Sequence, residues 1–197
     1  MRRSSGLAAA ALVLVAALGC RVDSRDDYLG DKDPRHFGLG HPVDSARLAT
    51  LDIDVSPNGA GLPAGHGTAA EGAAVYAASC ASCHGANGEG VPPSPRLVGG
   101  PRTFNFAMDG APKTIGNYWP YATTLFDYIR RAMPITTPGS LTADQTYAVT
   151  AYLLEREQVI PAGAVVDARS LPQVVMPARD HFVPDDRGGN RGGQNVK

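Results

Sequence analysis

The chain has 197 residues, of which 43% are hydrophobic and 19% are charged, and its formal net charge at pH 7 is -1. Because 18 basic residues stand against 19 acidic ones, with no basic stripe, the charge pattern argues against nucleic-acid binding. The length suits about one domain plus extensions. The 23 glycines and 16 prolines predict a small core that carries long irregular segments.

Residues 1–19 are expected to be a secretory signal peptide. Met1-Arg2-Arg3 is basic, residues 7–18 form an apolar run, and small residues precede Cys20. That run is too short to span a bilayer, which needs about 20 residues. The Leu-Gly-Cys ending also resembles a bacterial lipobox, so Cys20 is either acylated or a spare thiol. An unpaired thiol is a liability in an oxidising compartment, which favours acylation. We expect an exported, periplasmic protein that meets the membrane only through a lipid anchor on Cys20.

Three segments follow the signal. Residues 20–66 hold many turn formers and few periodic apolar positions, which predicts an extended N-terminal arm. Residues 67–160 carry the helical signals and are expected to form the domain. Residues 161–197 have a composition like that of the first arm and end in a tail that is expected to be disordered. The arms are expected to wrap the domain or to grip a partner.

Two of the predicted helices begin at capping boxes. Thr68 with Glu71 precedes alanines at helical spacing, and this helix runs into residues 80–84. Thr142 with Gln145 begins another helix, which ends before residue 161.

A third helix and a long loop lie between these two. The helix begins at about Thr123 or Thr124 and ends near Met133, because Pro134 cannot continue it. Residues 85–122 are broken repeatedly by glycine and proline, and a loop this long is unusual inside a compact domain. The loop becomes reasonable if it wraps a large prosthetic group that replaces the missing core.

Cys80-Ala81-Ser82-Cys83-His84 has the attachment pattern of a c-type haem. Two cysteines on one helical turn can each form a thioether to a haem vinyl group, and His84 then lies beneath the iron as proximal ligand. A structural zinc site needs four ligands, but the other cysteine and histidines are scattered. A thioredoxin-type dithiol expects a preceding strand, and a plain disulfide would leave the long loop without a core. We expect one covalent haem c, since the motif occurs once.

Met133 is the candidate for the sixth iron position. It lies at the end of a predicted helix and is followed by Pro134, so its thioether can be held steady. Met108 and Met176 are expected to fill gaps in the core, as methionine commonly does. Ligation by histidine and methionine raises the haem potential and leaves no open position for a substrate. Such an iron carries electrons.

The leading helix, the Cys80–His84 motif, the glycine- and proline-rich stretch after it, Met133-Pro134 and the closing helix together resemble class I cytochrome c. The resemblance covers about residues 67–156. It implies an all-α fold of three to five helices around one covalent haem, with irregular N- and C-terminal arms.

The same resemblance assigns packing roles to particular residues. In that family the first and last helices cross through a small residue and aromatics, for which Gly72, Tyr76 and Tyr152 are suited. A proline carbonyl accepts the Nδ1–H of the proximal histidine, which fixes the ring and its basicity. Pro95 matches that proline.

Three further segments, 113–134, 52–68 and 171–182, are similar to the cytochrome subunits of bacterial sulfite and sulfur dehydrogenases of the Sox type. The resemblance implies a partner subunit that oxidises the sulfur compound at a molybdenum cofactor. The cytochrome then passes single electrons to another cytochrome c or to an oxidase. Two alternatives stay open: a free-standing lipid-anchored electron shuttle, and a haem protein with an open iron for ligand sensing or peroxide chemistry.

The resemblance also suggests roles around the haem. Tyr118, Trp119 and Tyr121 have polar tips and are suited to shield the haem edge while bonding a propionate. Arg96 and Arg102 are the candidates for pairing with a propionate, against the alternative of solvated surface arginines.

Arg130 and Arg131 are expected beside the haem edge on the Met133 side. A docking partner would approach there, and complementary charge would speed its association. A surface helix with two arginines needs no such explanation, so both interpretations stay open.

Overall fold

The structure is a computed structural model that describes residues 42–101, 104–105, 107–108 and 110–183. The chain divides into two compact units, Met1–Arg47 and Leu48–Lys197. Of the first unit the structure describes residues 42–47, where the Asp44 carboxylate accepts the Arg47 N–H at 2.8 Å. The predicted signal peptide, Cys20 and the tail from residue 184 lie outside the described residues.

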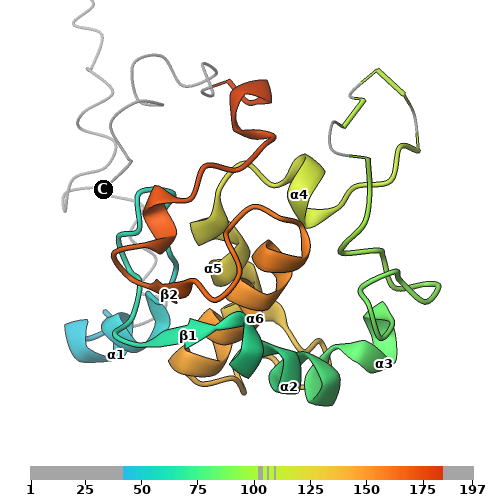
Figure 1. The fold of residues 1–197 in the computed structure, drawn as a ribbon. Coiled ribbons are helices and arrows are strands. Elements are labelled where there is room, and N and C mark those ends of the chain that lie inside the picture. The colour runs from blue at the N-terminus through green and yellow to red at the C-terminus, as the bar shows by residue number, and fades with distance from the viewer. Residues whose placement is uncertain (1–41, 102–103, 106, 109, 184–197) are drawn as a thin grey trace, which may run out of the picture. The chain divides into compact units, whose positions relative to one another are not determined.

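The described chain is mostly helical, which confirms the predicted fold class (Figure 1). It has more helices than the three to five expected, because several are only one or two turns long. In chain order the elements are α1 (Ser45–Leu51), β1 (His66–Thr68), α2 (Ala69–Ser79), α3 (Ala81–His84), α4 (Ile115–Tyr118), α5 (Ala122–Ala132), α6 (Ala143–Arg156), β2 (Val165–Asp167) and two 3-10 turns, η2 (Leu171–Gln173) and η3 (Arg179–His181).

Both predicted capping boxes are confirmed. At the start of α2 the Thr68 N–H donates to the Glu71 carboxylate at 2.8 Å, and the Glu71 N–H donates to the Thr68 hydroxyl. At the start of α6 the Thr142 N–H donates to Gln145 Oε1 at 2.9 Å, and the reverse bond from the Gln145 N–H is also present. These paired bonds satisfy main-chain donors that the first turn of a helix leaves without partners.

α2 and α6 cross where a glycine allows their main chains to touch. A Cβ on Gly72 would lie 1.9 Å from the carbonyl oxygen of Ala148 and 2.8 Å from Cβ of Tyr152, which is far inside van der Waals contact. The rings of Tyr76 and Tyr152 pack beside this point with centroids 5.1 Å apart. The predicted crossing through a small residue and two aromatics is therefore present.

α5 presents its apolar face to the same core. It begins at Ala122, one residue before the predicted range, and Leu125, Phe126 and Ile129 are buried as expected. Met133 is its C-cap and donates its N–H to the Ile129 carbonyl at 3.0 Å. The helix therefore ends where the prediction placed its end.

The segments that flank the helices contribute to the core. β1 and β2 form a small antiparallel sheet that the sequence did not indicate, with Gly67 opposite Val166. Val55 comes from the N-terminal side, and the C-terminal side supplies buried residues at Ile160, Val166, Leu171 and Met176. The expectation that Met176 fills a core gap is confirmed. The same expectation for Met108 is wrong, because Met108 is 52% exposed on an irregular loop.

The long loop is held by contacts to distant helices. In Figure 1 the residues described between α3 and α4 form no helix or strand. The Ile115 N–H donates to the Leu97 carbonyl at 2.9 Å, and the Gly99 N–H donates to the Glu157 carboxylate at 2.8 Å. α4 was not predicted. Its first turn is organised by Asn117, a buried amide that accepts the Thr114 N–H.

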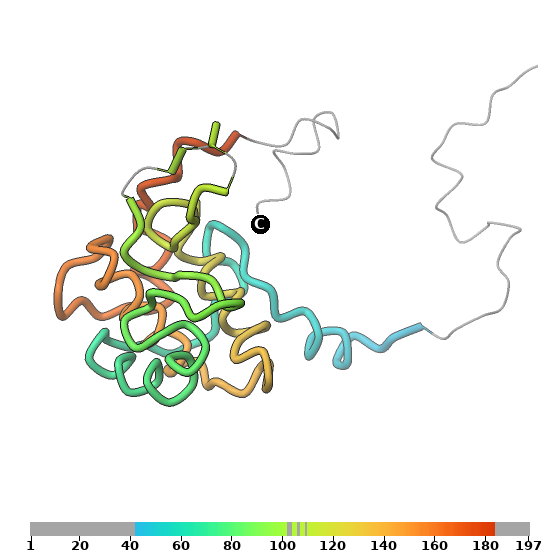
Figure 2. Tube along the Cα trace, turned by 90° about the vertical axis from the view of Figure 1, so that its right-hand side faces the viewer, coloured from blue at the N-terminus to red at the C-terminus, as the bar shows by residue number. Residues whose placement is uncertain are grey.

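The C-terminal segment lies beside α4 in both views of the trace (Figures 1 and 2). The rings of Phe182 and Tyr118 pack edge to face with centroids 5.7 Å apart. Chain after α6 therefore covers part of the loop that precedes α5.

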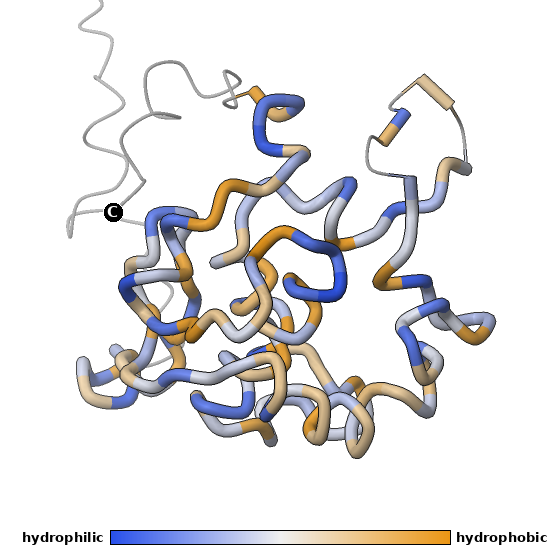
Figure 3. Tube along the Cα trace, in the orientation of Figure 1, coloured by the Kyte–Doolittle hydropathy of each residue, from blue (hydrophilic) through white to orange (hydrophobic). Residues whose placement is uncertain are grey.

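Hydrophobic and hydrophilic residues are interspersed along the described chain, with no long hydrophobic stretch (Figure 3). Within residues 42–183, apart from the three gaps, no helix has both the length and the apolar character needed to cross a membrane.

Replacing Gly72 with alanine is expected to destabilise the fold by about 2 kcal/mol, because the added methyl group meets the main chain of α6. Helix propensity alone would make the alanine variant more stable, because alanine forms helices better than glycine, so a loss of stability indicates the clash with α6. At the neighbouring exposed position, Ala73→Gly is the control and should cost about 1 kcal/mol from propensity alone. Thermal unfolding of the purified variants measures both, and a Gly72→Ala protein as stable as the parent would contradict the crossing.

Candidate haem site

The two cysteines and the histidine lie on one turn at the junction of α2 and α3. Cys80 is both the C-cap of α2 and the N-cap of α3, and its carbonyl accepts the N–H groups of Cys83 and His84 at 3.1 and 2.9 Å. Both thiols are free; Cys80 is half-buried and Cys83 is exposed. The turn therefore presents two separate sulfur nucleophiles rather than a disulfide.

The residues around the motif favour neither a structural zinc site nor a thioredoxin-type dithiol. Across the described stretches of the chain, no group of three or more His, Cys, Asp or Glu residues is placed to hold a metal ion. A helix, α2, leads into the motif, whereas a thioredoxin-type dithiol follows a strand.

The chain after the motif folds back onto it. The Tyr76 hydroxyl, which is buried, donates to the Gly85 carbonyl at 2.8 Å and so ties the exit of α3 to α2. The Gly90 N–H donates to the His84 carbonyl at 2.7 Å. Gly90 has a φ of 83°, and a Cβ there would lie 2.7 Å from the Arg96 nitrogen, so glycine permits the close approach of these two loop segments.

His84 is oriented by the proline that the resemblance indicated. Its Nδ1 lies 2.9 Å from the Pro95 carbonyl oxygen. A carbonyl can only accept, so Nδ1 carries the proton and Nε2 keeps its lone pair for a metal. The contact also fixes the orientation of the ring as a ligand.

Burial distinguishes the two thiols. Cys80 is more enclosed, and loss of solvent raises the pKa of its thiol to about 11, with the neighbouring Cys83 as a smaller cause. Burial likewise raises the pKa of Tyr76 to about 12.

The residues present fit a covalent haem. Two free thiols on one turn suit two vinyl groups, and an imidazole with a free Nε2 suits iron. Met133 supplies a soft sulfur at the end of α5, where it is half-buried and packs against the core. This set of haem ligands does not include Met108 or Met176.

The aromatic residues of the loop make contacts that the sequence did not indicate. Tyr118 packs edge to face with Phe104, with centroids 5.1 Å apart, and the Lys113 ammonium lies 4.5 Å from the Tyr118 centroid. Trp119 packs against Tyr128 of α5 with centroids 5.7 Å apart.

Tyr121 lies under a cation from the C-terminal segment, with the Arg179 guanidinium 4.3 Å from its ring centroid. The proposed shielding and propionate roles of Tyr118, Trp119 and Tyr121 stay predictions.

The arginines assigned to the haem edge also have protein partners. Arg96 is exposed and donates to the Gly99 carbonyl at 3.1 Å, so it braces the loop, and its propionate role stays a prediction. Arg102 lies outside the described residues. Arg131 pairs with Asp127, and Arg130 donates to the Ile53 carbonyl at 3.2 Å. The arginine pair thus serves internal contacts, which the docking interpretation did not include.

Sequence reasoning missed two acidic residues that organise the site's surroundings. Asp127 lies in the middle of α5 and is buried, and Glu157 at the end of α6 accepts from the loop at Gly99. An aspartate at the i−4 position from Arg131 was the available signal for the first. Nothing local indicated the second, because its partner lies 58 residues away.

Comparison with known proteins gives two results. A family model described as Cytochrome c matches residues 69–157. A chain in the crystal structure of the sulfane dehydrogenase SoxCD from Paracoccus pantotrophus is 39% identical, with a TM-score of 0.68 and coverage of 79% of this chain and 75% of that one. Residues 69–157 make up less than half of the chain, so this second similarity extends into the flanking segments. Comparison with curated proteins gives no match.

Stability is expected to fall as pH rises through the range between about 10 and about 12. The unfolded chain releases tyrosine protons near 10, whereas burial holds the pKa of Tyr76 and Tyr147 at about 12 in the fold, so ionisation then favours unfolding. Tyr76→Phe should flatten this dependence, and Tyr128→Phe, at a position 46% exposed, is the control. Denaturant midpoints measured across this pH range test the prediction. If the midpoint of Tyr76→Phe falls with pH as steeply as that of the parent, the prediction is contradicted.

Proposed function

Because the chain belongs to the cytochrome c family, and therefore carries covalent haem c and transfers electrons, we propose that it is the electron-accepting subunit of a dehydrogenase that oxidises sulfite or a related sulfur compound. The observation that carries the proposal is the 39% identity to a chain of the sulfane dehydrogenase SoxCD over 79% of this chain. A generic cytochrome likeness would be confined to the helices around the haem motif. Here the similarity includes segments that flank the helical domain.

In this proposal each residue of the site has a distinct task. Cys80 and Cys83 would hold the haem by thioethers, His84 would bind the iron through Nε2, and Met133 would supply a sulfur ligand. The haem supplies an iron that changes its charge by one electron. Pro95 keeps the imidazole in one orientation, and Gly90 allows the loop that carries Pro95 to close over it.

The position of Met133 supports an electron carrier rather than a ligand-binding haem. The residue is the C-cap of α5 and its N–H is bonded to Ile129, so the main chain that carries the thioether is ordered. With a sulfur ligand in place, the iron has no position for peroxide or a diatomic gas. The protein's part is then to hold both ligands still while the charge on the iron changes.

The proposed partners follow from this reaction. A molybdenum-containing subunit donates single electrons, and another cytochrome c or an oxidase accepts them. From the sequence pattern of residues 1–20 we propose that the protein is exported to the periplasm and tethered by a lipid on Cys20.

Replacing Met133 with alanine is expected to open the iron. Oxidised wild-type protein should show the weak far-red absorption of sulfur-ligated haem c, and the variant should lose it while keeping the covalent haem. Carbon monoxide should then bind the reduced variant rapidly and the parent slowly. Met176→Leu is the matched control, because Met176 is buried in the core and should leave both spectra unchanged. Rapid carbon monoxide binding by the parent would contradict the carrier assignment.

Purification from native membranes or periplasm tests the partner. The chain should co-purify with a molybdenum-containing subunit, and its haem should become reduced when sulfite or a sulfane donor is added. A chain that purifies without molybdenum, and whose haem stays oxidised, would identify a free-standing electron shuttle instead.

A further inference from the structure

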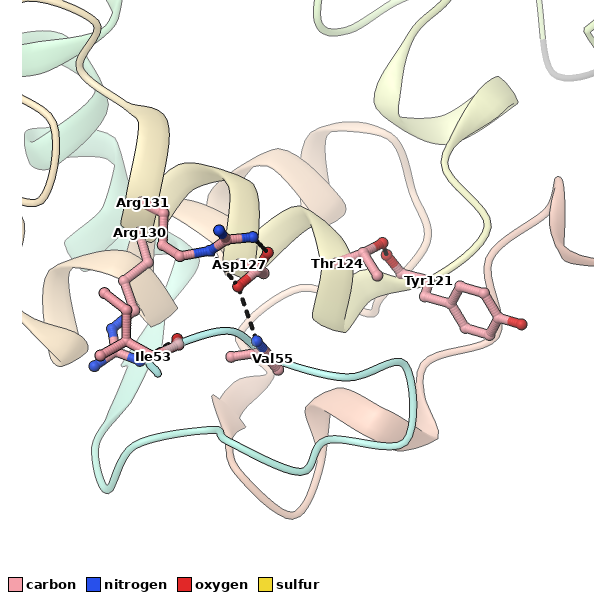
Figure 4. Close-up of polar contacts among 7 residues, drawn as sticks. All are labelled: Ile53, Val55, Tyr121, Thr124, Asp127, Arg130 and Arg131. Atoms are coloured by element: carbon pink, nitrogen blue, oxygen red, sulfur yellow. Dashed lines mark hydrogen bonds and ion pairs between the residues drawn. The ribbon is translucent and has the colours of Figure 1, made fainter. Parts of the chain in front are cut away.

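One face of α5 is polar and holds a distant part of the chain. Thr123, Asp127 and Arg130 are spaced four and three residues apart, so they form one polar stripe along the helix, beside the buried Phe126. The facing chain is residues 53–57, which we call the strap. Figure 4 shows Asp127 between the Arg131 guanidinium and the Val55 amide, and Arg130 directed toward Ile53. Of these residues, Arg130 and Arg131 were expected to meet solvent or a docking partner.

Asp127 is the centre of the contact. It is only 9% exposed, and its Oδ1 accepts the Val55 N–H at 2.8 Å and the Arg131 Nε–H at 2.8 Å. Its Oδ2 accepts a second bond from the same guanidinium. A buried carboxylate is costly unless it is paired and hydrogen-bonded; Arg131 pairs with Asp127 from within the helix, and the strap adds the bond from the Val55 amide.

Two more bonds hold the strap on either side of Val55. The Arg130 guanidinium donates to the Ile53 carbonyl at 3.2 Å, and the Thr123 hydroxyl donates to the Pro57 carbonyl at 3.0 Å. Val55 itself is buried in the core. The strap is therefore attached at three points along α5, to partners 66 to 77 residues away in the chain.

These bonds act on the last turn of α5, which carries Met133. Arg130 and Arg131 are three and two residues before Met133; Arg130 is bonded to the strap and Arg131 to Asp127. Helix ends unwind readily because their last carbonyls have no partner in the helix. Side chains tied to a distant segment oppose that unwinding.

We propose that Asp127 is a positioning residue for the Met133 thioether: by binding the strap and Arg131 together it keeps the end of α5 wound, so that the sulfur stays on the iron. This inference rests on the proposed role of Met133 in the haem site. In this proposal Arg130 and Arg131 stabilise the helix end that carries Met133, and they are not needed for docking a partner. Residues before the domain thus help to set the state of the haem.

The test compares Asp127→Asn and Asp127→Ala in the haem-loaded full chain. Asparagine removes the charge pair and keeps an acceptor for Val55, whereas alanine removes both. In the order parent, Asn, Ala, the far-red band should disappear at progressively lower temperature. Carbon monoxide binding to the reduced protein should become faster by about tenfold for the loss of a charged hydrogen bond.

Hydrogen exchange at the Val55 amide provides a direct reading of the strap. It should quicken in Asp127→Ala, and the change should accompany the loss of the far-red band. Arg130→Met is a milder variant that removes only the bond to Ile53, and it should shift the band and the gas-binding rate in the same direction by less. Asp180→Asn is the matched control, because it removes one negative charge at an exposed position and should change neither.

Two results would overturn the proposal. One is faster exchange at Val55 with an unchanged band and gas-binding rate, which would make the strap a structural attachment only. The other is an equal spectral change in Asp180→Asn, which would make the effect one of net charge. These measurements need no dehydrogenase partner. Their outcome therefore tests the role of Asp127 independently of co-purification with a molybdenum subunit.

Discussion

The close contact between α2 and α6 at Gly72 determines where the haem motif and the loop that faces it lie. Because the glycine has no side chain, the Ala148 carbonyl can lie against α2, and the aromatic rings of Tyr76 and Tyr152 then pack beside the contact. The Cys80–His84 turn follows directly on the end of α2, and Glu157, the C-cap of α6, accepts the Gly99 N–H of the loop. A shift of one helix against the other would therefore displace both the haem motif and the loop that faces it.

The long loop has little regular structure and yet is well anchored. Single hydrogen bonds hold it to the helices at its two ends. The Leu97 carbonyl accepts from Ile115 of α4, and the Pro95 carbonyl accepts from His84 of α3. A small domain with few large apolar residues cannot form a full core from the loop alone. A covalent haem supplies apolar surface against which such a loop can pack, which explains why a long irregular loop is found in this domain.

The flanking segments belong to the same structural unit as the helices. β1 and β2 join chain before α2 to chain after α6, and Leu171 and Met176 are as buried as any residue of α6. On the other side, the strap lies along the polar face of α5. An ion pair on a helix surface contributes little by itself. When it encloses a buried main-chain amide, as Asp127 and Arg131 do at Val55, it fixes where a remote segment lies.

The family resemblance indicated Pro95, which orients His84. The sequence by itself determined the helical class, the starts of α2 and α6, the end of α5 and the haem motif. Each of these depends on residues close in the chain: a capping pair, a helix-stopping proline, or two cysteines and a histidine on one turn. Only the tertiary structure decided what Asp127, Glu157 and the arginine pair do, and that Met108 is exposed. Their partners lie tens of residues away, and a charged side chain on a helix has the same local pattern whether it meets water or a strap.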